Sequence, residues 1–165
     1  MMKNNDNTDL MILSEIRFGF LHTYRVAGMG EPWSMKIDKT LQLLREQGIG
    51  AILTLTEDDL YGKRYQDAGF MHFHEPIDDA RAPTMEGMDR SIEFINSSLQ
   101  KELGVVVHCV EGRGRTGIVL CAWLGLTEGL GPKGAILRVF ELRSHTVLSP
   151  VQRSFIYQYL DNRHI

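Results

Sequence analysis

The sequence has little cysteine, and its two cysteines are poorly placed for crosslinks or metal. Cys109 and Cys121 are too few for a disulfide framework, and neither has the close cysteine partner that a zinc site needs. The sequence therefore predicts no metal centre. It also predicts a reducing compartment, for which the cytoplasm is the natural candidate.

Long hydrophobic runs and a positive net charge are also absent. No apolar stretch approaches the length of a membrane span, and residues 10–13 are too short a run for the core of a signal peptide. The net charge is −3, so no global positive field indicates nucleic acid. We therefore expect no membrane insertion and no nucleic-acid partner, and we expect a monomer.

What is present is a polar start followed by alternating apolar segments, with no repeat and no linker. We expect residues 1–13 to form a flexible N-terminal tail and residues 14–165 to form a single catalytic domain. A chain of 165 residues can bury a core without disulfides or metals. Short strand-like segments alternate with helix-like ones. This alternation is typical of an α/β protein with a central, mostly parallel sheet of four to five strands flanked by helices.

The apolar segments predict the following elements. Strands are expected at residues 24–27, 51–55, 70–74 and 105–107, with 16–20 as a candidate partner of the first strand. Helices are expected at 38–47, at 57–68 with Thr56 as its cap, from 84 to about 103, at 116–129, from Pro132, and at 150–162. The fully apolar strand 105–107 suits the centre of a parallel sheet. The loop after it would then lie at the carboxyl edge of the sheet, where ligands bind.

Residues 108–117 form the most informative segment and read HCVEGRGRTG. Gly112 and Gly114 allow the backbone to curl between a strand and the next helix. Such a curl can turn successive N–H groups inward as an anion nest, and the helix N-terminus adds partial positive charge. A phosphate would fit there. The predicted phosphate-binding residues are Val110, Glu111, Gly112, Arg113, Gly114 and Arg115.

The side chains of this segment suit nucleophilic chemistry on phosphate. Cys109 would lie beneath the phosphate, where the N–H groups favour the thiolate, which is the nucleophile at neutral pH. The fork of Arg115 can hold two phosphoryl oxygens while the thiolate attacks in line. Thr116 can point its hydroxyl at the sulfur and stabilise the thiolate when it leaves. A buried structural cysteine beside a surface arginine is the alternative, but it explains neither the glycines nor the spacing.

These residues resemble the HCxxGxxR signature, followed by Ser or Thr, of the protein tyrosine phosphatase superfamily. The positions that match are His108, Cys109, Gly112, Arg115 and Thr116. In size and element order the chain also resembles the small atypical dual-specificity phosphatases. The resemblance implies a phosphatase-like fold and metal-independent hydrolysis of phosphate monoesters through a phosphocysteine intermediate, without a cofactor. It implies a phosphorylated protein as substrate, with phosphotyrosine and phosphoserine or phosphothreonine as targets.

The leaving group needs a proton, and residues 76–83 form a loop with adjacent acids. In the resembled family the general acid lies on such a loop, a few residues before a proline. Counting back from Pro83 favours Asp79, with Asp78 as the alternative general acid and Glu75 as a third candidate. The acids that are not catalytic can be solvated loop residues or helix caps.

Several further polar residues have assignments that stay open. Gln152 lies where several family members carry a glutamine that positions water for the second step, but it could equally be a polar residue of a helix start. His108 is expected to orient the loop through hydrogen bonds. His72 and His74 alternate on one predicted strand and could form a metal pair, although polar residues at this period usually mark the exposed face of a sheet. Cys121 lies in an apolar helix and is predicted to be core.

The sequence leaves the substrate open. The chain has no evident insertion resembling the phosphotyrosine-recognition loop of larger tyrosine phosphatases, which favours a shallow pocket for Ser, Thr and Tyr phosphates. Arg113 adds positive charge, as in lipid-directed relatives, and Arg25 and Arg81 could line the rim. Phosphoinositides and RNA 5′-phosphates therefore remain candidate substrates. A phosphate-binding module without turnover and a sulfurtransferase remain candidate functions beside the phosphatase.

Overall fold

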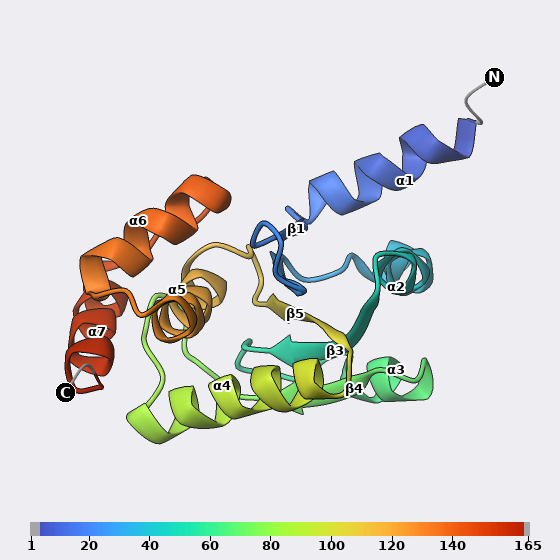
Figure 1. Cartoon of the computed structure of the whole chain (residues 1–165). Coiled ribbons are helices and arrows are strands. Elements are labelled where there is room, and N and C mark those ends of the chain that lie inside the picture. The colour runs from blue at the N-terminus through green and yellow to red at the C-terminus, as the bar shows by residue number, and fades with distance from the viewer. Residues whose placement is uncertain (1–3, 164–165) are drawn as a thin grey trace.

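A five-stranded sheet runs through the part of the chain that the computed structural model describes, residues 4–163 (Figure 1). Its strands are β1 (Gly19–Phe20), β2 (Val26–Met29), β3 (Ile49–Thr54), β4 (Met71–His74) and β5 (Gly104–His108). The spatial order is β1-β2-β5-β3-β4, in which only the β1–β2 pair is antiparallel. The predicted α/β class with a mostly parallel sheet is confirmed.

Helices cover both faces of this sheet (Figure 1). They are α1 (Asn4–Glu15), α2 (Ile37–Glu46), α3 (Gly62–Asp67), α4 (Met85–Gln100), α5 (Gly114–Glu128), α6 (Pro132–Leu142) and α7 (Pro150–Asp161), with a short 3₁₀ turn at Ser34–Lys36. One apolar cluster joins α4–α7 to the sheet, and the other joins α2 and α3 to its opposite face. Among residues 4–163, no helix is long and apolar enough to cross a membrane.

Strand β5 lies at the centre because both of its faces are apolar. Val105 and Val107 join the cluster with α5, and Val106 joins the cluster with α2. The strand pairs with β2 on one side and β3 on the other, so that His108 is in register with both Met29 and Thr54. The loop that follows β5 therefore starts at the carboxyl edge of the sheet, as predicted.

The N-terminal segment differs from the prediction. Residues 4–15 form helix α1, where the sequence predicts a flexible tail over residues 1–13, and residues 1–3 lie outside the described residues. The flexibility of this segment stays a prediction. Ile12 is buried, and Asp9 forms an ion pair with Lys39 of α2 at 3.0 Å. The polar sequence does not predict this helix, because its stability comes from tertiary packing rather than from local helix propensity.

The helix predicted at residues 57–68 is also shorter than expected. Helix α3 begins only at Gly62, and residues 57–61 form a loop at the carboxyl end of β3. Thr56 does not cap a helix, since its Oγ1 donates to the carbonyl oxygen of Asp58 at 2.8 Å within that loop. Threonine can bond to nearby backbone in this way and so compete with helix formation. The consequence is that Glu57 is free to reach the site described next.

Candidate active site

The loop between β5 and α5 curls tightly against the end of β2. Gly112 has a left-handed φ of 68°, and a Cβ there would collide with the backbone of Met29 and Gly30. A Cβ on Gly30 would in turn lie 2.9 Å from the carbonyl oxygen of Val110. Both glycines are needed for this close approach of backbones. Helix α5 begins at Gly114, so its N-terminus opens onto the same curl.

Cys109 lies at the base of this loop and is 2% exposed. The hydroxyl of Thr116, in the first turn of α5, donates to Cys109 Sγ at 3.1 Å. A hydrogen bond to sulfur favours the charged thiolate over the neutral thiol. The structure thus brings together the two residues that the sequence predicts as nucleophile and thiolate stabiliser.

Arg115 carries a guanidinium that reaches from α5 to two other loops. Its Nη1 donates to Glu57 Oε2 at 2.6 Å and to the carbonyl oxygen of Ile77 at 3.0 Å. Its Nη2 lies 3.4 Å from Asp79 Oδ1. Its Nε is buried and has no hydrogen-bond partner among the described residues. Two carboxylates and one carbonyl oxygen therefore hold the guanidinium, while its Nε remains without a partner among the described residues.

Glu57 is a part of the site that the sequence does not reveal. Its Oε2 accepts from Arg115, and its Oε1 accepts from the backbone N–H of Asp79 at 2.9 Å. A hydrogen bond from its own backbone N–H, and then the bond from Arg115, lower the pKa of this carboxyl. Glu57 thereby links Arg115 to residues 76–83, called the acidic loop below. No motif marks it, because the local sequence predicts a helix there.

The acidic loop presents Asp79 rather than Asp78 to the arginine. The Asp79 carboxylate is 84% exposed yet remains 3.4 Å from Arg115. Asp78 closes the turn instead, since its carbonyl oxygen accepts from the N–H of Arg81 at 3.0 Å. Ala80 takes a left-handed φ of 57° between them. This geometry favours Asp79 as the general acid.

Glu75, the third candidate acid, has a structural role. Its carboxylate is largely buried and accepts two hydrogen bonds from Arg90, at 2.9 Å and 2.8 Å. Both carboxylate oxygens are therefore engaged by Arg90 rather than by Arg115. It also packs against Gly87 of α4, where a Cβ would collide with it.

Gln152 lies beside the start of α5 but is engaged by other groups. Its Oε1 accepts from the N–H of Ser149 at 3.0 Å, and its Nε2 donates to the carbonyl oxygen of Arg81 at 3.0 Å. Ser149 completes a capping box at the start of α7 and donates from Oγ to the carbonyl oxygen of Ala80 at 2.7 Å. The two side chains therefore hold the acidic loop against α7. Water positioning by Gln152 stays a prediction.

His108 is fully buried behind the nucleophile. Its Nε2 lies 2.9 Å from Thr54 Oγ1 and 3.3 Å from the Tyr65 hydroxyl, and its Nδ1 lies 3.4 Å from the carbonyl oxygen of Cys109. Burial lowers the pKa of His108 to about 4. The ring is therefore neutral at pH 7, and it serves the loop through hydrogen bonds.

The other histidines of the sheet do not converge. His72 Nε2 contacts Thr54 Oγ1 at 2.9 Å, whereas His74 Nε2 contacts the carbonyl oxygen of Thr56 at 2.7 Å. Within residues 4–163 no group of three His, Cys, Asp or Glu side chains could hold a metal ion. Cys121 is buried in α5, and burial raises its pKa to about 12, as suits a core thiol.

Comparison with known proteins decides the family. A family model described as "Polymorphic toxin system, DSP-PTPase phosphatase" matches residues 27–139. The chain belongs to this DSP-PTPase family. The resemblance to the tyrosine phosphatase superfamily that the loop residues indicate is thereby confirmed.

Individual relatives of this DSP-PTPase chain agree. It is 42% identical over 86 residues to an uncharacterized protein of Methanocaldococcus jannaschii, covering 52% of each chain. It is 25% identical over 159 residues to the tyrosine-protein phosphatase CDC14 of Candida albicans, covering 95% of this chain and 28% of that one. The crystal structure of Tk-PTP in the active form superposes with a TM-score of 0.78 at 25% identity, covering 89% of this chain and 97% of that one. The chain spans about half the length of the curated relatives it matches first.

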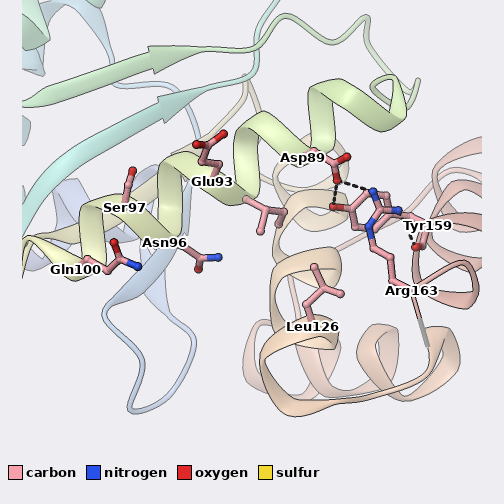
Figure 2. Close-up of a pocket in the computed structure, with 9 residues that line it drawn as sticks. Asp89, Glu93, Asn96, Ser97, Gln100, Leu126, Tyr159 and Arg163 are labelled. Atoms are coloured by element: carbon pink, nitrogen blue, oxygen red, sulfur yellow. Dashed lines mark hydrogen bonds and ion pairs between the residues drawn. The ribbon is translucent and has the colours of Figure 1, made fainter. Parts of the chain in front are cut away.

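The DSP-PTPase chain also has a cavity of about 450 Å³ that lies away from the loop 108–116, between α4, α5 and α7 (Figure 2). Asp89 on its wall accepts hydrogen bonds from the Tyr159 hydroxyl, at 2.7 Å, and from Arg163. None of its lining residues belongs to the loop 108–116 or to the acidic loop. The residues that the sequence predicts to be catalytic instead lie at the carboxyl edge of the sheet.

Proposed function

We propose that this protein hydrolyses phosphate monoesters without a metal, through a phosphocysteine intermediate on Cys109. The observation that carries the proposal is the Thr116 hydroxyl bound to the Cys109 sulfur at 3.1 Å beneath a curled loop and a helix N-terminus. A buried thiol needs no such arrangement if it only fills space. A nucleophilic thiolate needs all three elements.

In the first step the Cys109 thiolate attacks phosphorus, so that a sulfur–phosphorus bond forms while the phosphorus–oxygen bond to the leaving group breaks. Arg115 exchanges its present contacts with Glu57 and Asp79 for two phosphoryl oxygens. Asp79 donates its proton to the leaving oxygen. Its exposed carboxylate and its place at the arginine support this role.

In the second step a water attacks the phosphocysteine, and the electron pair of the breaking bond returns to sulfur. Asp79, now a carboxylate, takes the proton of that water. The Thr116 hydroxyl stabilises the returning thiolate through the bond already present at 3.1 Å. Gln152 lies beside Gly114 and could position the water once the acidic loop moves and frees its amide.

The proposed substrates are phosphorylated proteins, with phosphotyrosine and phosphoserine or phosphothreonine accepted. The exposed positions of Val110, Arg113 and Asp79 around the loop support a shallow site. Phosphoinositides and RNA 5′-phosphates are the alternative substrates of the same chemistry. The mechanism needs a free Cys109 thiol, which fits the reducing cytoplasm.

The test is hydrolysis of p-nitrophenyl phosphate in the presence of a chelator. We expect turnover with wild type, none with Cys109→Ser, and full turnover with Cys121→Ser, which removes the other buried thiol. Cys109→Ser should still bind inorganic phosphate. Activity that a chelator abolishes, or that persists in Cys109→Ser, contradicts the mechanism. Phosphopeptides, phosphoinositides and 5′-phosphorylated RNA under one condition then rank the substrates, and sulfur transfer from thiosulfate tests the alternative enzyme class.

A further inference from the structure

The phosphate loop is the name used below for residues 109–115, the proposed phosphate-binding loop. Three successive carbonyl oxygens of this loop each accept a hydrogen bond from outside it. The pairs are Glu31 N–H to Val110 O at 2.9 Å, Arg17 Nη1 to Glu111 O at 3.3 Å, and Arg143 Nη1 to Gly112 O. The donors come from three separate segments of the chain. Two of them are arginine side chains that the phosphatase chemistry above does not use.

The direction of these carbonyls determines the direction of the N–H groups that would bind phosphate. A peptide unit is planar and trans, so its C=O and its N–H point in opposite directions. When the carbonyls of residues 110–112 point outward to the donors, the N–H groups of residues 111–113 point to the other side. Three aligned N–H groups on one side of a curled loop form an anion nest.

Arg143 is an unusual donor because its guanidinium is buried. It is 4% exposed, and its Nη2 donates to the carbonyl oxygen of Arg17 at 2.9 Å. No carboxylate within residues 4–163 forms an ion pair with it, and its Nε has no hydrogen-bond partner there. Gly28 of β2 makes room for it, since a Cβ there would lie 2.8 Å from this Nε.

Burying a guanidinium without a counter-charge is costly, so the fold must gain something from it. Burial lowers the pKa of Arg143 to about 10, and the negative charge that opposes this shift is that of Cys109. The charge of Arg143 therefore lies within electrostatic reach of the thiolate and of any anion in the loop. A buried cation acts over such a distance more strongly than an exposed one.

We propose that Arg143 is a positioning residue of the phosphate cradle, which holds the Gly112 carbonyl outward so that the next N–H group points at the anion. The inference rests on the proposed function of the loop as a phosphate cradle. The hydrogen bonds of Arg143 go to the carbonyl oxygens of Gly112 and Arg17. Arg143 acts through the backbone of residues 112–113 and through its buried charge.

The test compares Arg143→Met, which keeps the length and removes the charge, with Arg143→Lys, which keeps the charge without the fork. Arg138→Met is the matched control, because Arg138 lies on α6 and, within residues 4–163, its ion pairs are with Glu128 and Glu141. Two readouts need no turnover. One is the pH profile of Cys109 alkylation by iodoacetamide, and the other is calorimetric binding of inorganic phosphate to each variant in the Cys109→Ser background.

We expect Arg143→Met to move the alkylation midpoint upward by about one pH unit and to weaken phosphate binding roughly tenfold, the size of one charge-assisted hydrogen bond. The alkylation midpoint and the phosphate affinity of Arg143→Lys should lie between those of Arg143→Met and wild type. Both values should be unchanged from wild type in Arg138→Met. Unchanged readouts in a folded Arg143→Met protein overturn the inference. If circular dichroism finds Arg143→Met unfolded, Arg143→Lys decides, and wild-type values for it in both readouts overturn the inference as well. Absence of phosphate binding in the Cys109→Ser parent contradicts the proposed function instead.

Discussion

At the scale of single residues, Asp79 and Asp78 differ in their distance from Arg115, so we expect their substitutions to lower kcat by different amounts. We expect Asp79→Asn to lower kcat about 100-fold, the effect of losing a general acid, whereas Asp78→Asn lowers it only a few-fold. The loss at Asp79 should be larger with phenyl phosphate than with p-nitrophenyl phosphate, because phenoxide is the poorer leaving group. Steady-state kinetics on both substrates measure this. A larger loss of kcat for Asp78→Asn would reverse the assignment.

The buried ring of His108 makes stability depend on pH. Its pKa is about 4 in the folded protein and about 6.5 in an unfolded chain, so between these values the unfolded state binds more protons. Stability is therefore present above pH 6.5 and is lost as pH falls toward 4. From pH 7.5 to 5.0 we expect the free energy of unfolding to drop by roughly 2 kcal/mol through this group. His72, whose pKa burial also lowers, adds a drop of the same sign.

Urea unfolding at the two pH values checks this expectation. His108→Gln should lose less stability between pH 7.5 and 5.0 than wild type. His72→Gln should also lose less than wild type, but by a smaller difference. His22→Asn is the control, since His22 is exposed and has a left-handed φ of 53° that asparagine tolerates. Equal slopes for wild type and His108→Gln would contradict the role of burial.

How much of the site the sequence predicts depends on how local each interaction is. The motif residues Cys109, Arg115 and Thr116 lie within one loop and the first turn of the next helix, so their spacing alone predicts that they lie close together. Glu57 is 58 positions from Arg115, and Arg143 is 31 positions from Gly112. Such contacts depend on the order of the strands and on loop paths, and no spacing rule in a single sequence reports them.

At the scale of elements, the start of α7 controls the acidic loop. Ser149 Oγ accepts from the N–H of Gln152 at 3.2 Å and donates to Ala80 O at 2.7 Å, so one hydroxyl caps the helix and holds the loop. We expect Ser149→Ala to cost about 1 kcal/mol of stability, the usual value of such a cap, and to lower kcat several-fold. Urea unfolding and phenyl phosphate kinetics measure the two effects. Ser154→Ala, on the exposed side of the same helix, should change neither, and an unchanged kcat in Ser149→Ala would contradict the link to the loop.

Elements with strong local patterns are predicted well from the sequence, and those stabilised by distant partners are not. The start of α4 is predictable because Thr84 accepts from the N–H of Gly87 at 3.0 Å, a bond between close neighbours. The helix predicted at 57–68 is too long because Glu57 and Thr56 bond elsewhere. Helical propensity is a weak preference that such tertiary bonds override.

At the scale of the whole molecule, the sheet arrangement follows from apolar strands and the helices between them, which the sequence indicates. The extent of the folded region does not follow, because the first residues are polar and their helix becomes stable only against the rest of the chain. Lys36 and Lys39 reach α1 through Glu15 and Asp9, at 2.6 Å and 3.0 Å. The N-terminal residues are thus attached to the fold by side chains far from any motif.

A substitution pair within α1 tests whether this segment belongs to the folded unit. Ile12 is 7% exposed and its neighbour Met11 is 57% exposed, so the two differ in burial but not in location. We expect Ile12→Ala to lower the free energy of unfolding by about 2 kcal/mol, at the low end for buried isoleucine because the helix lies at the edge of the core. Met11→Ala should stay within about 0.5 kcal/mol of wild type. If both variants unfold at the wild-type urea concentration, residues 4–15 contribute nothing to stability and behave as the tail that the sequence predicts.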